Sequence, residues 1–257
     1  MKGGQVGIFV LVGVALTIAV VLVYFLVFSF QEDSIGGLKD IDSDFIQPVT
    51  VFSDCLQENA NFSLRNVMLH GGFFNVSQRG VKVPIVGEYE KLETSKLFEL
   101  FEGLRGISPY WVVNGKVISP SLKRVEKEIG ESIYFLDSVC FETVDQFKEF
   151  NYTVGEKKID VLIEEEGVTF NFEYSVSFFN GELSYVLPKF SYFINSSATG
   201  LINDASGVIN SLQANSSIVD LSLLESLDSN VVIHSYEGDL FFEMWRDDET
   251  ITFLAKV

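Results

Sequence analysis

In the stretch KKIDVLIEEEGVTFNFEYSVSFFNGELSYVL, residues 157–187, apolar and polar residues alternate almost one by one. A period of two is typical of β-strands that bury one face. The acidic turn at 164–167 separates two such runs, and Asn180-Gly181 favours a tight turn into a third. The stretch therefore predicts a three-strand antiparallel meander. Its alternating apolar positions are Ile159, Val161, Ile163, Val168, Phe170, Phe172, Tyr174 and Val176.

Helical patterns precede the meander. The residues from Val49 to His70 predict a helix that Gly71-Gly72 ends, with the first glycine in the left-handed cap position. A shorter helix is expected over residues 92–104. Another is expected to start at Ser119-Pro120, interpreted as N-cap and first helical residue, and to bury one apolar stripe. That stripe consists of Leu122, Val125, Ile129, Ile133, Leu136 and Cys140.

Further strands and helices complete the pattern. Asn114-Gly115 between Tyr110–Val113 and Lys116–Ile118 predicts a hairpin. After the meander, Pro188 to Leu212 predicts a helix and Leu221 to Leu227 a short one. The last three strands, expected to complete the same sheet, are Val231–Tyr236, Leu240–Arg246 and Ile251–Ala255. The chain therefore belongs to the α+β class, with antiparallel sheets and packed helices.

The beginning of the chain has a different composition. Residues 6–30 carry no charge, and as a helix they would extend about 37 Å, enough to cross a hydrocarbon core of about 30 Å. We expect a retained transmembrane helix. Lys2 precedes it and Glu32 and Asp33 follow it, which predicts a cytoplasmic N-terminus and an external C-terminal domain. Residues 31–47 are the expected linker and residues 48–257 the extracytosolic domain, with a division near position 150 left open.

The short basic head, residues 1–5, ends in two glycines directly before the apolar run. It resembles the class III signal peptides of archaeal type IV pilin-like proteins, which implies a cut between Gly4 and Gln5. Many pilins have Glu five residues after the cut, where this chain has Phe9. An uncut signal anchor remains the alternative.

The same opening, from Lys2 to Phe9, is similar to an uncharacterised family of archaeal single-pass surface proteins. Looser similarities are the Cys-Leu at Cys55, the glycine pair at Gly71 and the cysteine at Cys140. That family has no assigned activity, so the resemblance implies a cell-surface location and nothing about chemistry.

The chain has two cysteines, Cys55 and Cys140, each on the apolar side of an expected helix. They lack CxxC spacing and have no nearby histidine, which disfavours metal binding and redox shuttling. Outside the cell a single disulfide is the simple outcome, and it would join two helices. Two buried free thiols are the alternative.

Asparagine sequons are more frequent than chance and all follow the apolar run, which fits an external location. They offer sites for N-glycosylation at Asn61, Asn75, Asn151, Asn195 and Asn215. Asn61 and Asn195 fall within expected helices, so not all five need be used.

Composition and motifs exclude several functions. The net charge of −18 disfavours nucleic-acid binding, and two histidines with two cysteines leave no zinc cluster. A helix cap explains His70-Gly71-Gly72 better than an esterase oxyanion hole, because no G-x-S-x-G motif accompanies it. The acidic run 164–166 lacks the spacing of an EF loop. We expect no enzyme, no cofactor and no metal.

The function predicted from these features is structural. We expect a membrane-anchored, pilin-like surface protein that contacts lipid through residues 6–30. Small residues in that helix, Gly7, Gly13 and Ala15, would allow close self-association. The alternative is a permanently anchored domain that binds a surface partner or scaffolds the envelope without forming filaments.

Overall fold

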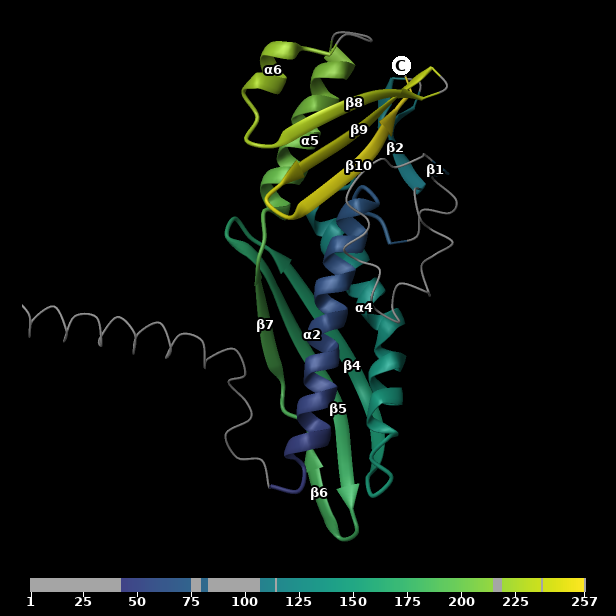
Figure 1. The fold of residues 1–257 in the computed structure, drawn as a ribbon, viewed down its shortest axis with the longest axis vertical. Coiled ribbons are helices and arrows are strands. Elements are labelled where there is room, and N and C mark those ends of the chain that lie inside the picture. Colours follow the sequence, from purple (N-terminus) through teal and green to yellow (C-terminus); the bar gives the residue numbers. More distant parts are fainter. Residues whose placement is uncertain are drawn as a thin grey trace, which may run out of the picture.

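The computed structural model describes residues 43–74, 80–82, 107–113, 115–214, 219–236 and 238–256. Within them, two long helices lie beside one antiparallel sheet, and a second sheet with two further helices lies beyond their far end (Figure 1). The helices are α2 (Ile46–Leu69), α4 (Leu122–Val144), α5 (Ala198–Ala214) and α6 (Leu221–Glu225). The predicted α+β class with antiparallel sheets and packed helices is confirmed.

The predicted meander forms the first sheet, here called the meander sheet. Its strands are β4 (Asn151–Ile163), β5 (Gly167–Asn180), β6 (Leu183–Val186) and β7 (Phe190–Asn195). Strand β5 is central, β4 pairs along one side of it, and β6 and β7 share the other side. The turn at Asn180-Gly181 is as predicted, with Gly181 at φ +61°.

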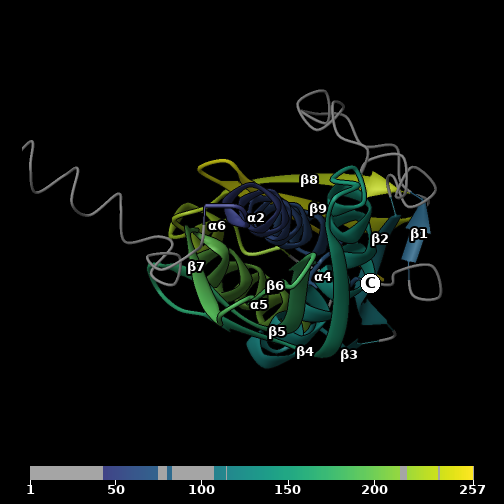
Figure 2. The same cartoon turned by 90° about the horizontal axis from the view of Figure 1, so that it is seen from below.

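One face of the meander sheet is buried and the other is open. Alternate β5 side chains, from Val168 to Phe178, are buried under α2 and α4, which lie side by side on that face (Figures 1 and 2). Phe52 of α2 meets the rings of Tyr174 and Phe178, with centroids 6.1 Å apart in both pairs. The period of two therefore identified the buried face correctly.

The C-terminal strands do not complete the meander, contrary to the expectation. They form a second sheet, here called the mixed sheet, in the order β1-β2-β10-β9-β8, with β3 pairing β2. Its strands are β1 (Gly80–Lys82), β2 (Ile107–Val113), β3 (Lys116–Val117), β8 (Asn230–Tyr236), β9 (Asp239–Arg246) and β10 (Glu249–Ala255). The rings of Trp111, Phe253 and Phe242 stack across β2, β10 and β9, which gives this sheet its own aromatic core.

The helix predicted from Pro188 to Leu212 begins ten residues later than expected. Residues 190–195 form strand β7, and only then does α5 start, at Ala198. Phe190 and Tyr192 lie opposite Phe172 and Phe170 of β5, so the side-chain period of two in this segment serves pairing with β5. The prediction was wrong because the apolar stripe of α5 follows this short strand directly, and the strand was assigned to the same helix.

The start of α4 also differs from the prediction. The helix begins at Leu122 with Ser121 at the N-cap position, so Ser119 and Pro120 are not N-cap and first helical residue. Pro120 is buried against Gly72, since a Cβ added to that glycine would meet its ring at 2.8 Å. Packing between α2 and α4 therefore fixes the start of the helix. The apolar stripe from Val125 to Cys140 is buried as predicted.

The glycine pair ends α2 as predicted. Gly71 has φ +60°, its N–H donates to Met68 O, and the Gly72 N–H donates to Val67 O, which is a Schellman motif. The mixed sheet satisfies two more carbonyls at this end. Thr252 Oγ1 donates to Leu69 O at 2.6 Å, and Trp111 Nε1 donates to Gly71 O at 3.0 Å. The end of α2 is thereby fixed to the mixed sheet.

We expect Gly71→Ala to lower the free energy of unfolding by about 2–4 kcal/mol, because a left-handed residue with Cβ is strained and the site is full. The new Cβ would lie 2.6 Å from the Pro109 ring and 2.7 Å from Thr252 O. Gly115→Ala is the matched control, since Gly115 also has positive φ but no atom within 4 Å of its Cβ position. Urea denaturation measures both; equal losses would contradict the steric argument.

A single large hydrophobic cluster links residues on both sides of position 150, from Phe45 to Ala255. The predicted transmembrane helix at 6–30 and the helix at 92–104 lie outside the described residues. No helix in the described part of the chain combines the length and the apolar character needed to span a membrane.

Candidate functional site: the disulfide-linked helix pair

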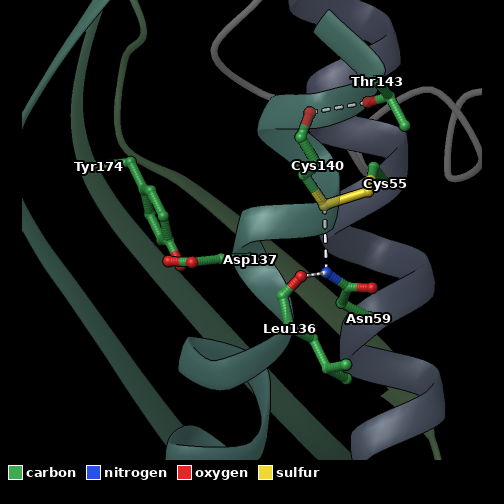
Figure 3. Close-up of a disulfide and its surroundings, with 7 residues drawn as sticks. All are labelled: Cys55, Asn59, Leu136, Asp137, Cys140, Thr143 and Tyr174. Carbon is green, nitrogen blue, oxygen red and sulfur yellow. Dashed lines mark hydrogen bonds between the residues drawn. A yellow bond between two sulfur atoms is a disulfide. The ribbon is translucent and has the colours of Figure 1, made fainter. Parts of the chain in front are cut away.

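Cys55 of α2 and Cys140 of α4 form a disulfide, with the sulfur atoms 2.10 Å and the Cα atoms 5.5 Å apart (Figure 3). Cys140 is fully buried at the end of the apolar stripe of α4, and Cys55 is half-buried. The helical period brings both cysteines to the shared side of the two helices. The sequence-based prediction that a bridge joins two helices therefore agrees with the structure.

Asn59, one turn after Cys55, lies against the disulfide. Its Nδ2 donates to Leu136 O at 3.2 Å and contacts Cys140 Sγ at 3.1 Å (Figure 3). Sequence analysis missed this residue, although its i,i+4 spacing from Cys55 places both on one side of the helix. Asn59 therefore ties the two helices together beside the covalent link.

A row of buried polar side chains continues from Asn59 along the helix interface. Asn59, Ser63 and Asn66 follow at spacings of four and three residues, and Ser132 is buried on α4. In each of them one polar side-chain atom has no hydrogen-bond partner within the described structure. Each such atom costs about 1–3 kcal/mol. The disulfide and the hydrogen bond from Asn59 to Leu136 O link the two helices beside these atoms.

A charged cluster lies one turn before Cys140, where α4 meets the meander sheet. Asp137 is buried, and its Oδ2 accepts from Lys157 Nζ at 2.9 Å and from the Tyr174 hydroxyl at 3.2 Å. The lysine ammonium also lies 4.9 Å from the ring centroid of Phe141, a cation–π distance. Figure 3 shows Tyr174 pointing from the sheet towards Asp137. This cluster joins α4 to both β4 and β5.

Burial, and next the charge of Asp137, raise the pKa of the Tyr174 hydroxyl far above its ordinary value near 10. The native state therefore keeps this proton where the unfolded chain releases it. We expect stability to fall above about pH 10, by up to about 1.4 kcal/mol per pH unit from this residue. Tyr174→Phe should flatten that slope in urea titrations between pH 9 and pH 11. An unchanged slope in the variant would contradict the assignment.

An open groove of about 490 Å³ lies between α4 and the edge strand β4. Side chains of both signs line it, and Lys127 pairs with Glu131 at 3.2 Å. Glu126 accepts from the Ile163 N–H of the edge strand at 3.1 Å. Because the charges are mixed and partly paired, the groove does not favour a ligand of one sign.

The described residues contain no group of three His, Cys, Asp or Glu side chains placed to hold a metal ion. His70 sits at the C-cap of α2 with Nδ1 2.6 Å from Asn66 O, in agreement with the helix-cap interpretation of His70-Gly71-Gly72. The other histidine, His234, is exposed and stacks on Phe241.

The predicted modification sites have different environments. Asn61 lies inside α2, and its Nδ2 donates to Gln57 O at 3.1 Å and to the Tyr192 hydroxyl at 3.0 Å. Asn151 and Asn195 are exposed at strand ends. Asn75, Asn215 and the expected cut between Gly4 and Gln5 lie outside the described residues.

The described site therefore holds two helices and a sheet together, and its geometry provides no reacting centre among the described residues. No protein-family model, no curated protein and no solved structure matches this chain.

Proposed function

We propose that this chain is a membrane-anchored, pilin-like cell-surface protein with a structural or interaction role. The observation that carries the proposal is the uncharged apolar run at residues 6–30, close to the start of a chain whose body has a disulfide between two helices. Disulfides persist in oxidising compartments, so the bridge supports a body outside the cytoplasm.

The position of α2 supports this anchoring. The helix starts at Ile46, at the end of the molecule opposite the mixed sheet (Figure 1). The fifteen residues 31–45 separate it from the apolar run. Fully extended, such a segment reaches about 50 Å. A segment of this length allows the whole body to lie outside the bilayer.

Self-association would occur through the anchor. Gly7, Gly13 and Ala15 lack bulky side chains, which lets identical helices approach closely in lipid. A cut after Gly4 would remove Lys2, the charged residue just before the apolar run. The freed helix could then pack beside others in a filament core.

Native membranes provide the test. The protein should stay in the membrane pellet after alkaline carbonate washing, and N-terminal sequencing should begin at Gln5. Sedimentation of mild-detergent extracts should show assemblies much larger than a monomer. Gly13→Leu should reduce their size while the body keeps its disulfide.

Three results would contradict parts of this proposal. Release by carbonate would exclude the anchor. A retained Met1–Gly4 head would exclude the pilin-like cut, and a small species of constant size would favour the alternative of a permanently anchored binding or scaffold domain. Release by carbonate concerns the location of the protein, whereas a retained head or a small species concerns its processing and assembly.

A further inference from the structure

The open face of the meander sheet holds an asparagine site with unusual surroundings. Asn195 ends β7 and lies opposite Gly167 of β5, so no side chain faces it from the neighbouring strand. It is exposed to solvent. Since Gly167 is on the same face as Thr169 and Asn171 of β5, Asn195 belongs to the face turned away from α2 and α4.

An exposed aromatic ring lies beside this asparagine. Phe193 precedes Asn195 by two residues, about 7 Å along the strand, and shares its face. The ring is 52% exposed and leans over Gly167, where an added Cβ would meet Phe193 Cζ at 2.6 Å. One side of the Phe193 ring therefore faces solvent, and the ring lies next to Asn195 on the same face.

We propose that Asn195 carries an N-linked oligosaccharide whose first sugar packs against the ring of Phe193. The segment Asn195-Ser196-Ser197 is a sequon, and a pyranose has an apolar C–H face that suits an aromatic ring. The inference rests on the external location argued under the proposed function. It adds a modification that this location alone does not specify.

The modification is a group transfer from a lipid-linked glycosyl phosphate donor. Asn195 Nδ2 bonds to the anomeric carbon of the sugar, the bond from that carbon to the phosphate oxygen breaks, and the lipid phosphate leaves. The amide nitrogen gives up one proton. Ser197 Oγ in the folded protein donates to Glu249 Oε2 at 2.9 Å or to Arg246 O at 3.1 Å. Transfer therefore requires that Ser197 be free of Glu249 and Arg246 when the sugar is added.

The other two described sequons, at Asn61 and Asn151, differ from Asn195 in the hydrogen bonds of the amide or in the surrounding side chains. Asn61 uses its amide group in two hydrogen bonds inside the protein, so a glycan there would break the contact with Tyr192. Asn151 is exposed on the same open face, opposite Phe179, but the residue two positions before it is Glu149. Among these three, Asn195 has the more exposed neighbouring ring, since Phe193 is 52% exposed whereas Phe179, opposite Asn151, is half-buried.

The remainder of the open face is compatible with a sugar cover. In the middle of this face the side chains are polar and pair with one another. Ser191 donates to Asn171 at 2.6 Å, and Lys189 pairs with Glu173 at 2.7 Å. Apolar side chains are exposed towards the ends of this face, Leu162 and Phe193 opposite Thr169 and Val186 opposite Ser177. A glycan at Asn195 would lie over it and leave the helix side free.

The experiment uses the full-length protein from carbonate-washed membranes of cells that produce it naturally. Glycopeptide mass spectrometry should find the Asn195 peptide with added hexose or N-acetylhexosamine mass and the Asn61 peptide without any. Asn195→Gln should remove one glycan's mass from the intact protein, whereas Asn61→Gln should leave the glycan mass unchanged.

A thermal measurement tests the role of the ring. Removal of the glycans should lower the Tm by about 2–4 °C, the shift expected for loss of one sugar–aromatic contact. In Phe193→Ala the same treatment should leave the Tm unchanged. An equal shift in that variant would overturn the contact with Phe193.

The outcomes separate this inference from the proposed function. Protein that stays in washed membranes with an unmodified Asn195 overturns the inference alone. Protein that carbonate releases without any glycan overturns both. A glycan on Asn61 in folded protein overturns the selection by hydrogen bonding.

Discussion

The double variant Cys55→Ala, Cys140→Ala is expected to lose about 4–5 kcal/mol of unfolding free energy. The bridge joins residues 85 positions apart, and closing a loop of that length restricts the unfolded chain by about 4.6 kcal/mol in the entropy model. Equilibrium urea denaturation, monitored by tryptophan fluorescence, measures the loss. Because the total stability of a domain is about 5–15 kcal/mol, this loss removes between about a third and nearly all of it.

The interface beside the bridge should respond first. Asn59 and Ser63 have buried polar atoms without hydrogen-bond partners in the described structure, and these atoms gain water when the helices separate. Hydrogen exchange in α2 should therefore accelerate more than exchange in β9 and β10. Ser138→Ala, at an exposed position of α4, is the matched control and should change neither quantity.

Reduction of the wild-type protein provides an independent check. A strong reductant should lower the urea midpoint of the wild type to that of the double variant and leave the variant itself unchanged. If the wild type keeps its midpoint after its thiols are shown to be free, the bridge does not stabilise the fold.

Patterns of local periodicity accounted for much of this fold. The meander, the buried stripe of α4 and the cap at Gly71 follow from local periodicity and from helix capping. They can therefore be predicted from the residues of each segment. The cysteine pair was predictable for the same reason. Each cysteine had to lie on the buried side of its own helix.

Features that depend on contacts between distant segments were not predictable. The period of two in residues 190–195 is too short to outweigh the helical stripe of α5 that follows it, and the deciding partner is β5. The parallel pairing of β10 with β2 joins segments about 140 residues apart. Asp137 was likewise not singled out, since its partners Lys157 and Tyr174 come from other elements.

Lys157→Met is expected to cost about 3–5 kcal/mol at neutral pH, the usual effect of removing one partner of a buried ion pair. Asp137 is 4% exposed and would keep only the Tyr174 hydroxyl as a partner in this cluster. The methionine side chain fills most of the volume of the lysine stem, so the loss measures charge and not a cavity. Urea denaturation at pH 7 gives the value.

Lys158→Met is the matched control for Lys157→Met. Lys158 is the next residue of β4 and pairs with Asp160, but both side chains are about half exposed, so the variant should keep the urea midpoint of the wild type. The combined variant Asp137→Leu, Lys157→Met removes both buried charges and should recover most of the stability lost in Lys157→Met. If the combined variant is as unstable as Lys157→Met, the lysine acts through packing on Phe141 and Tyr134 and not through the carboxylate.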